Sequence, residues 1–439
     1  MEKKELLKEL LVSSRKTLPG ALTERDISLP VDSGKIITVS GVRRSGKSAL
    51  LHLTMQYLLK QGVAPEQILF LNFDDERLML RQNELDLVLQ AYRELNPYIP
   101  MEKTYIFFDE IQESEGWELF VRRIYDNETR QIFITGSNSK TLSSEIATTL
   151  RGRTLTYEIF PLSFREYCRF RKQDTQYYDT AVRAQLKVLY GEYTQSAFPE
   201  LTGAGTDRQL QILQEYYFVM LYRDMVERYR ISNLIALKYF IRRLMTNIGK
   251  PSSINKIYNE LKSAGITISK NSLYEWTEYL QNTYLFQALH RYENSAVKGL
   301  AIDRKFYCID NGLRRTLIHT GSEDRGSLLE NNIFLFLRSQ LKTGLSIYYY
   351  KGGKECDFVV TDREQCIALI QVSLRTDEAK TLQREISGLL EASLALQCNT
   401  LYIVTEDTEK TISEDGKEIH VVSAWKFTLS FSLASLLSS

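Results

Sequence analysis

Short apolar runs alternate with helical stretches along the first third of the chain. Each run is apolar almost throughout, as expected for parallel strands that are covered on both faces. Strands are predicted over KIITVS, ILFLNF, TYIFFD and QIFITG, at residues 35–40, 68–73, 104–109 and 131–136. The stretch from Gly46 to about Leu59 predicts a helix. Strands that alternate with helices imply right-handed crossovers, so we expect an α/β three-layer sandwich with a parallel sheet.

The pattern becomes mostly helical after residue 165 and changes again near residue 320. Residues 233–310 predict three helices followed by a hairpin, the outline of a winged helix-turn-helix. Further on, a helix, three strands, a second helix and two more strands predict another α/β domain. We therefore expect a parallel α/β domain, a helical lid or connector, a winged-helix-like domain and a C-terminal α/β domain, over residues 1–165, 166–232, 233–320 and 321–439.

Composition narrows the class of protein without naming a partner. Lys plus Arg is 56 and Asp plus Glu is 55, so a formal net charge of +1 gives no global attraction to nucleic acid or anionic membrane. The five cysteines are scattered without CxxC spacing, which disfavours a zinc site or a disulfide framework. No apolar run reaches the roughly 18 residues of a membrane span, and the charged N-terminus does not resemble a secretory signal. We expect a cytoplasmic protein.

The first predicted strand runs directly into a glycine-rich string that also opens the first helix. Residues 41–48, GVRRSGKS, fit the phosphate-loop pattern G-x-x-x-x-G-K-[ST]. Glycines let main-chain N–H groups cradle phosphate oxygens, and the helix N-terminus adds positive potential. Lys47 would reach the β- and γ-phosphates of ATP and Ser48 would ligate Mg²⁺. The predicted cofactor-binding segment comprises Gly41, Val42, Arg43, Arg44, Ser45, Gly46, Lys47, Ser48 and Ala49.

Two acids end the third strand, at the edge of an open α/β sheet where ligands bind. Asp109 is expected to hold Mg²⁺ through water, and Glu110 to polarise the attacking water. After the fourth strand, Ser137 or Asn138 would contact the γ-phosphate or that water, and the sequence does not choose between them. Asn72, Asp74 and Asp75 end the second strand; their acids either tune the metal site or form a surface turn.

Arg151 and Arg153 follow the last helical stretch of the first predicted domain. Arg151 or Arg153 would act as a finger on ATP bound to this chain or to a neighbouring subunit of a homo-oligomer, with an ordinary surface pair as the alternative.

Taken together, GVRRSGKS, LNFDDERL, IFFDEIQ, ITGSNS and LRGRTLTYEIFPLSFREY resemble AAA-superfamily P-loop ATPases related to the archaeal-ATPase, STAND-like group. Many such proteins carry a C-terminal domain of unknown function with a restriction-endonuclease-like core, and YLQNTYLF, YCIDNGLRR, LENNIFLFL, KECDFVV and IQVSL are similar to that part. The resemblance implies ATP binding, and it implies no particular substrate.

A nuclease of that fold needs carboxylates around Mg²⁺ and a lysine near the attacking water. Glu330 on a helix, Asp357 at the start of a strand and Gln371 on the next strand retain the expected layout. Gln371 is a neutral ligand, however, and Ser373 stands where a lysine is expected. Lys351, Lys354 or Lys380 would have to substitute for it. We expect a degenerate, inactive or binding-only site.

The winged-helix-like block gives a mixed signal for DNA. Its third helix carries Lys270 but also Glu275 and Glu278, which disfavours reading of the major groove. The predicted wing adds basic residues that could contact a DNA backbone: Arg291, Lys298, Arg304 and Lys305. A protein-interaction or packing role is therefore preferred to DNA binding for this block.

The leading hypothesis is a Mg²⁺-dependent ATPase that acts as a nucleotide-driven switch on a macromolecular partner, a protein not yet identified or DNA. Two alternatives stay open: an ATP-gated DNA-binding protein or nuclease, and a non-hydrolysing ATP-dependent regulator or scaffold.

Overall fold

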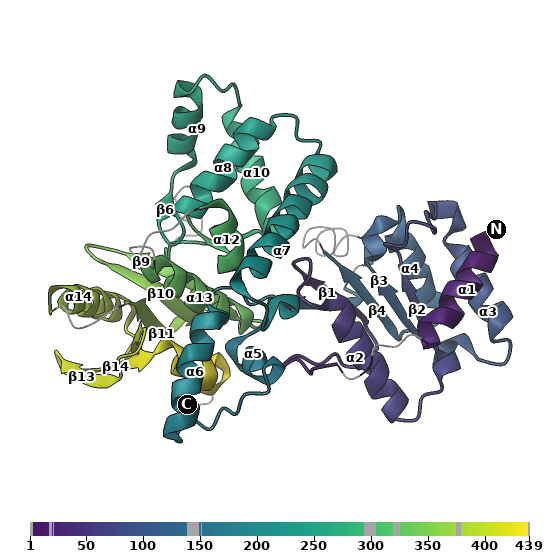
Figure 1. Cartoon of the computed structure of the whole chain (residues 1–439), viewed down its shortest axis with the longest axis horizontal. Helices are drawn as coiled ribbons and strands as arrows, with labels where there is room; N and C mark the ends of the chain where they lie inside the picture. Colours follow the sequence, from purple (N-terminus) through teal and green to yellow (C-terminus); the bar gives the residue numbers. More distant parts are fainter. Residues whose placement is uncertain are drawn as a thin grey trace. The chain divides into compact units, whose positions relative to one another are not determined.

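The computed structural model describes residues 3–16, 20, 22–137, 149–150, 152–293, 304–318, 325–374 and 379–437. The chain forms two compact units, residues 1–160 and 161–439 (Figure 1). The predicted site residues Asn138 and Arg151, and the predicted wing residue Lys298, lie outside the described residues. In the described ranges, no helix is both long enough and apolar enough to span a membrane.

The first unit contains a parallel five-stranded sheet in the order β2-β3-β4-β1-β5. Its strands are β1 (Ile36–Gly41), β2 (Ile68–Asn72), β3 (Tyr105–Asp109), β4 (Ile132–Gly136) and β5 (Thr154–Ile159). Its helices are α1 (Lys3–Lys16), α2 (Lys47–Lys60), α3 (Asp86–Leu95) and α4 (Trp117–Asn127). Short 3₁₀ turns occupy Pro65–Gln67, Gln82–Glu84, Met101–Lys103 and Ile111–Glu113.

Alternate residues of each strand serve the two faces of this sheet. In β3, Ile106 and Phe108 join a core with α1, α3 and α4, whereas Phe107 joins a second core with α2. This double burial explains why the strands are apolar almost throughout. The predicted α/β sandwich with a parallel sheet is confirmed.

The four predicted strands of the first unit are present within one or two residues of their predicted ends. The fifth strand, β5, was not predicted, because Leu155 is exposed and the strand has only one fully buried residue, Ile159. An edge strand of this kind lacks the continuous apolar run that marked the others.

The second unit begins with helices and a small sheet. The helices are α5 (Phe164–Phe170), α6 (Thr180–Tyr193), α7 (Thr206–Val219), α8 (Leu234–Thr246), α9 (Ile254–Ser263), α10 (Lys270–Asn282) and α12 (Asn311–Leu317), with a 3₁₀ turn at Pro199–Leu201 and a π-helix at Met220–Glu227. The antiparallel sheet β6-β8-β7 comprises β6 (Pro251–Ser252), β7 (Phe286–Leu289) and β8 (Arg304–Cys308).

A six-stranded mixed sheet in the order β13-β14-β12-β11-β10-β9 completes the second unit. Its strands are β9 (Leu345–Lys351), β10 (Glu355–Asp362), β11 (Gln365–Val372), β12 (Leu401–Thr405), β13 (Lys410–Glu414) and β14 (Lys417–Ser423). The accompanying helices are α13 (Arg325–Ser339), α14 (Ala379–Leu396), α15 (Ala424–Ser430) and α16 (Leu433–Leu436). The predicted order of a helix, three strands, a second helix and two more strands is therefore present, and β13 is an additional, unpredicted strand between the last two.

Candidate nucleotide site and a second polar network

The glycine-rich string lies between the carboxyl end of β1 and the first turn of α2, as predicted. Gly46 caps α2 with a φ of 96°, in the left-handed region that glycine adopts without strain. Gly41 has a φ of 156°, and a Cβ there would lie 2.2 Å from the carbonyl oxygen of Ile159. Both glycines are therefore needed for the path of the loop. Within it, the Ser45 hydroxyl donates to the carbonyl of Val42 at 2.8 Å.

Lys47 is buried at the start of α2, with its side chain 4% exposed. Its Nζ donates to the carbonyls of Gly41 and Val42 at 3.2 and 3.3 Å and lies 3.5 Å from Glu110 Oε1. Burial lowers the pKa of Lys47, against the opposing effect of the Glu110 and Asp109 carboxylates. The lysine and the two strand-end acids thus meet at one edge of the sheet.

Asp109 is buried beside Ser48 and Thr135. Burial raises the pKa of Asp109, while hydrogen bonds from Ser48 and Thr135 act in the opposite direction. A serine hydroxyl beside a strand-end carboxylate provides the hard oxygen donors that Mg²⁺ prefers. In the described ranges, no group of three or more His, Cys, Asp or Glu side chains could hold a metal ion. Magnesium in nucleotide sites usually needs only one or two protein ligands plus phosphates and water, so Ser48 and Asp109 fit it.

Glu110 follows β3 in a left-handed conformation, with a φ of 48°. Its carboxylate accepts hydrogen bonds from Ser137 Oγ at 2.7 Å and Gln112 Nε2 at 2.5 Å. Burial alone raises the pKa of Glu110, but the Lys47 charge and these hydrogen bonds outweigh it and hold the pKa below its usual value. The carboxylate is therefore ionised near neutral pH and fixed in direction.

Thr135 links the two acids and was not among the predicted site residues. Its hydroxyl accepts from the Glu110 main-chain N–H at 2.9 Å and donates to Asp109 Oδ1. The feature of the sequence that could have indicated Thr135 is its position, as a polar residue near the carboxyl end of an otherwise apolar strand. The two residues after the strand were predicted instead, and of these Ser137 does contact Glu110.

Two other predicted residues border this cluster: Asn72 aligns with Asp109 from the neighbouring strand β2, and the positive charge of Arg43 acts on Lys47 and Glu110. Arg43 is 4.0 Å from Glu113, and Asp75 pairs with Arg77 at 2.6 Å in a surface turn. Asn72 accepts from the main-chain N–H of Asp74, which also favours the turn interpretation.

Arg153 is paired with Asp126 at 3.0 Å, just before β5. Because Thr154 aligns with Ile36 and Ile159 with Gly41, Arg153 lies a full strand length from the loop, about 17 Å. An arginine side chain does not span that distance. This separation disfavours contact with phosphates bound at its own loop, and the proposed role of Arg153 as a finger stays a prediction.

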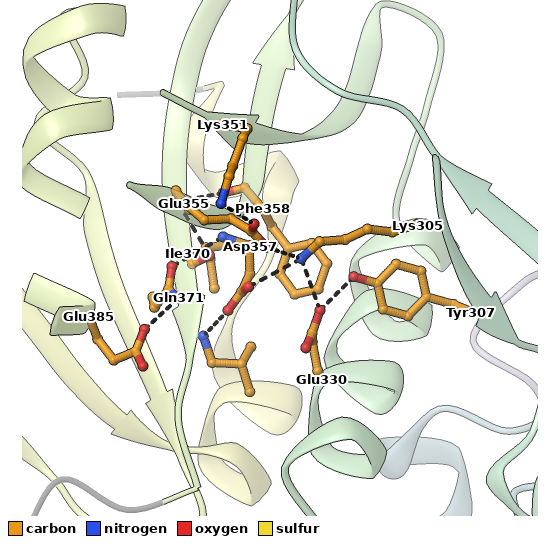
Figure 2. A network of polar contacts seen from close by, with 12 residues as sticks. Lys305, Tyr307, Glu330, Lys351, Glu355, Asp357, Phe358, Ile370, Gln371 and Glu385 are labelled. Carbon is orange, nitrogen blue, oxygen red and sulfur yellow. Dashed lines mark hydrogen bonds and ion pairs between the residues drawn. The ribbon is translucent and has the colours of Figure 1, made fainter. Parts of the chain in front are cut away.

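The residues predicted to form a degenerate nuclease-like site also lie close together, in the second unit (Figure 2). Gln371 Oε1 accepts from the Asp357 main-chain N–H at 3.1 Å, and Asp357 Oδ2 accepts from Val372 N–H at 2.9 Å. Gln371 Nε2 donates to Glu385 on α14 at 2.6 Å. Glu330 reaches the same place from α13 and accepts from the Tyr307 hydroxyl at 2.7 Å.

The centre of this network is Lys305 of β8, a residue predicted to lie in the wing. Its side chain is 1% exposed, and its Nζ lies 2.8 Å from Glu355 and 3.4 Å from both Glu330 and Asp357. Burial alone lowers the pKa of Lys305, but the three carboxylates outweigh it and hold the pKa above its usual value. The predicted substitutes do not take this place; Lys351, for instance, is half exposed and pairs with Glu355.

Burial raises the pKa of Glu330 to about 7, in spite of the nearby Lys305 charge. Burial likewise raises the pKa of Asp357 and of Glu385. The network therefore places several buried or partly buried carboxyl groups around one buried ammonium group.

Comparison with known proteins agrees with the first-unit geometry. A family model described as "AAA domain" matches residues 33–168, a range that contains the loop and β1 to β5. The fold and the match together define an AAA-type P-loop domain, a class that binds nucleotides. A second model, described as a domain of unknown function (DUF8612), matches residues 192–324.

Relatives that align along most of the chain define the family. The uncharacterized protein MJ1544 of Methanocaldococcus jannaschii is 33% identical over 445 residues, which cover 98% of this chain and 97% of that protein. The chain belongs to the same family as MJ1544. An uncharacterized protein of Haemophilus influenzae is 33% identical over 349 residues, 79% of this chain and 84% of that protein.

Among solved structures, AMPPCP-bound DnaA from Aquifex aeolicus aligns with 64% of this chain and 88% of its own, at 14% identity and a TM-score of 0.25. The S. cerevisiae Hsp104-ADP complex aligns with 96% of this chain and 71% of its own, at 10% identity and a TM-score of 0.25.

Proposed function

We propose that this protein is a magnesium-dependent ATPase whose nucleotide state acts as a switch on a macromolecular partner. The observation that carries the proposal is the convergence of the 41–48 loop, Asp109 and Glu110 at one sheet edge, with Lys47 Nζ 3.5 Å from Glu110 Oε1. Main-chain N–H groups at the helix start, one ammonium group and two strand-end acids form a suitable environment for a metal-bound triphosphate.

Each side chain has a role that follows from its chemistry. Lys47 binds the β- and γ-phosphates, and Ser48 and Asp109 hold Mg²⁺, which when bound neutralises phosphate charge. Glu110 orients and polarises the attacking water as a general base. Ser137 and Gln112 hold the Glu110 carboxylate in one direction, which supports that role.

The second unit is proposed to carry the output of the switch. Its helices α8, α9 and α10, followed by the β7–β8 hairpin, support a winged-helix-like domain over residues 233–320, preceded by a connector at 166–232. The mixed sheet with α13 and α14 supports a restriction-endonuclease-like domain over residues 321–439. An unidentified protein is preferred to DNA as the partner, since α10 exposes Glu275 and Glu278.

A metal-dependent nuclease is not favoured for the C-terminal domain. The ammonium of Lys305 lies between Glu330, Glu355 and Asp357, where a divalent cation would otherwise balance their charge. Gln371 is engaged by Asp357 and Glu385. We infer that this network is structural, and that plasmid DNA with Mg²⁺ or Mn²⁺ is cleaved no faster by the wild type than by Asp357→Ala.

Phosphate release tests the proposed ATPase activity directly. We expect Mg²⁺-dependent release by the wild type, and a rate about 100- to 1,000-fold lower for Glu110→Gln with ATP binding retained, because the general base is removed. Each protein is measured with and without duplex DNA, and the proposal expects equal rates. ATP binding by the wild type without phosphate release in either condition would instead favour a non-hydrolysing regulator. Stimulation by DNA would favour the DNA-directed alternative.

A further inference from the structure

The segment before β1 packs like a strand although it pairs with none among the described residues. Ile27, Leu29 and Val31 all contact the core on the α2 side of the sheet. This spacing of two residues brings alternate side chains to one side of an extended chain. Arg25 is the next position in the same alternation and is partly buried. The core therefore fixes the place from which Arg25 extends.

Arg25 joins two carbonyls that are far apart in sequence. Its Nη1 donates to the carbonyl of Ser45 at 2.7 Å, and its Nη2 donates to the carbonyl of Phe160 at 3.0 Å. Ser45 is inside the phosphate loop, whereas Phe160 directly follows β5 and is the last residue of the first unit. The planar guanidinium suits such a paired contact, because its N–H groups are held in a fixed fork.

The Ser45 contact determines the direction of a main-chain amide. In a trans peptide the C=O and the following N–H point in opposite directions, so a fixed Ser45 carbonyl turns the Gly46 N–H away from Arg25. Amides at the start of α2 are those that a phosphate would meet. The loop and the end of β5 also pack closely beside the Phe160 contact. Gly41 aligns with Ile159 there, and a Cβ at Gly41 would collide with the Ile159 carbonyl.

We propose that Arg25 is a positioning residue with two roles: it fixes the Ser45–Gly46 peptide for phosphate binding, and it couples that peptide to the point where the chain leaves the first unit. The inference rests on nucleotide binding as proposed above. Any change in the loop on ATP binding is then transmitted through one guanidinium group to Phe160, and from there along the backbone into Pro161.

The first experiment measures ATP affinity by calorimetry with Mg²⁺, for wild type, Arg25→Ala and Arg25→Lys. We expect about tenfold weaker binding for Arg25→Ala, since the loop amide is no longer held by a charged hydrogen bond. Arg123→Ala is the matched control: Arg123 lies on α4 and pairs with Asp86 at 2.6 Å. We expect it to bind ATP with wild-type affinity.

The second readout is hydrogen exchange in peptides covering residues 157–165, with and without saturating ATP. Wild type and Arg123→Ala should show an ATP-dependent change there, and Arg25→Ala should show none. Arg25→Lys, which preserves a charge and the fold, should also lose the change, because a single ammonium cannot reproduce the fork.

Arg25 variants with wild-type affinity and a wild-type exchange response would overturn the inference. Failure of the underlying function looks different: the wild type itself, like Lys47→Ala, would bind no ATP. If Arg25→Ala is unfolded by circular dichroism, Arg25→Lys alone decides, and an intact exchange response in that variant rejects the coupling.

Discussion

Two buried lysines, one in each unit, differ in how far neighbouring carboxylates compensate their charge. Lys47 of the phosphate loop is 4% exposed and Lys305 of the second unit is 1% exposed. Lys47 Nζ donates to two main-chain carbonyls and lies 3.5 Å from the carboxylate of Glu110. Lys305 has three carboxylates within 3.4 Å. The same residue type is thus weakly compensated in one site and surrounded by negative charge in the other.

The difference separates a binding site from a structural one. Burial lowers the pKa of Lys47, so a further anion beside it would be stabilising. Burial also acts on Lys305, but the carboxylates reverse the effect and raise its pKa. An ammonium group that is already neutralised offers little to a phosphate. We therefore expect changes at Lys47 to affect function and changes at Lys305 to affect stability.

The largest expected effect is on the stability of the second unit. Lys305→Met removes the counter-ion of one buried and two partly buried carboxyl groups, so the free energy of unfolding should fall by about 3–5 kcal/mol. Lys351→Met is the control, because Lys351 pairs with the same Glu355 from a half-exposed position, and its loss should cost less than about 1 kcal/mol. Urea titration measures both. Equal stability of the two variants would refute a structural role for Lys305.

A smaller effect is expected on phosphate release by the first unit. Thr135→Val keeps the shape of the side chain but removes the hydroxyl that links Asp109 to the Glu110 N–H. We expect phosphate release to slow by about 10- to 100-fold, as for other groups that orient a metal site from behind.

Thr38→Val is the matched control for Thr135→Val. Thr38 lies in the neighbouring strand β1, fully buried, and its hydroxyl has no hydrogen-bond partner among the residues described. That substitution should leave phosphate release unchanged. Similar rates for the two valine variants would show that the Thr135 hydroxyl does not organise the site.

The smallest expected effect is on how the free energy of unfolding depends on pH. The folded pKa of Glu330, about 7, lies above its usual value of 4.5, so the folded state holds this proton more tightly than the unfolded state. Its favourable contribution is fully present below about 4.5 and is lost as pH rises through about 7. Between pH 6 and pH 8 the free energy of unfolding should fall by about 1 kcal/mol through this group.

Glu330→Gln cannot titrate and should show a shallower fall over the same range, measured by urea titration. Glu110 has the opposite sign, since its pKa is lowered and its contribution is lost only at acid pH. An identical pH dependence in the wild type and Glu330→Gln would contradict the assignment.

The first site was predictable from sequence because its parts are local. The loop, the helix start and the strand-end acids each follow a buried strand, and parallel strands bring their carboxyl ends to one edge. Thr135 was not predicted because its role depends on two partners at the end of β3. These are the main-chain N–H of Glu110 and the carboxylate of Asp109. Arg25 was missed because no motif marks it, and its partners are 20 and 135 residues away.

The second site was only partly predictable. Glu330, Asp357 and Gln371 could be inferred from strand alternation and from the resemblance to a known family, but Lys305 and Glu385 could not. Lys305 belongs to a different sheet and meets Asp357 across 52 residues of sequence. Such contacts depend on how separate elements pack, which hydrophobic periodicity does not encode.

The central claim is that the 41–48 loop with Lys47 binds Mg²⁺-ATP. Calorimetric titration of ATP into wild type, Lys47→Ala and Lys305→Met tests it directly. We predict binding by the wild type, affinity reduced by about 100-fold or more in Lys47→Ala, and wild-type affinity in Lys305→Met wherever that variant is folded. Equal ATP affinity in Lys47→Ala and the wild type would contradict the account.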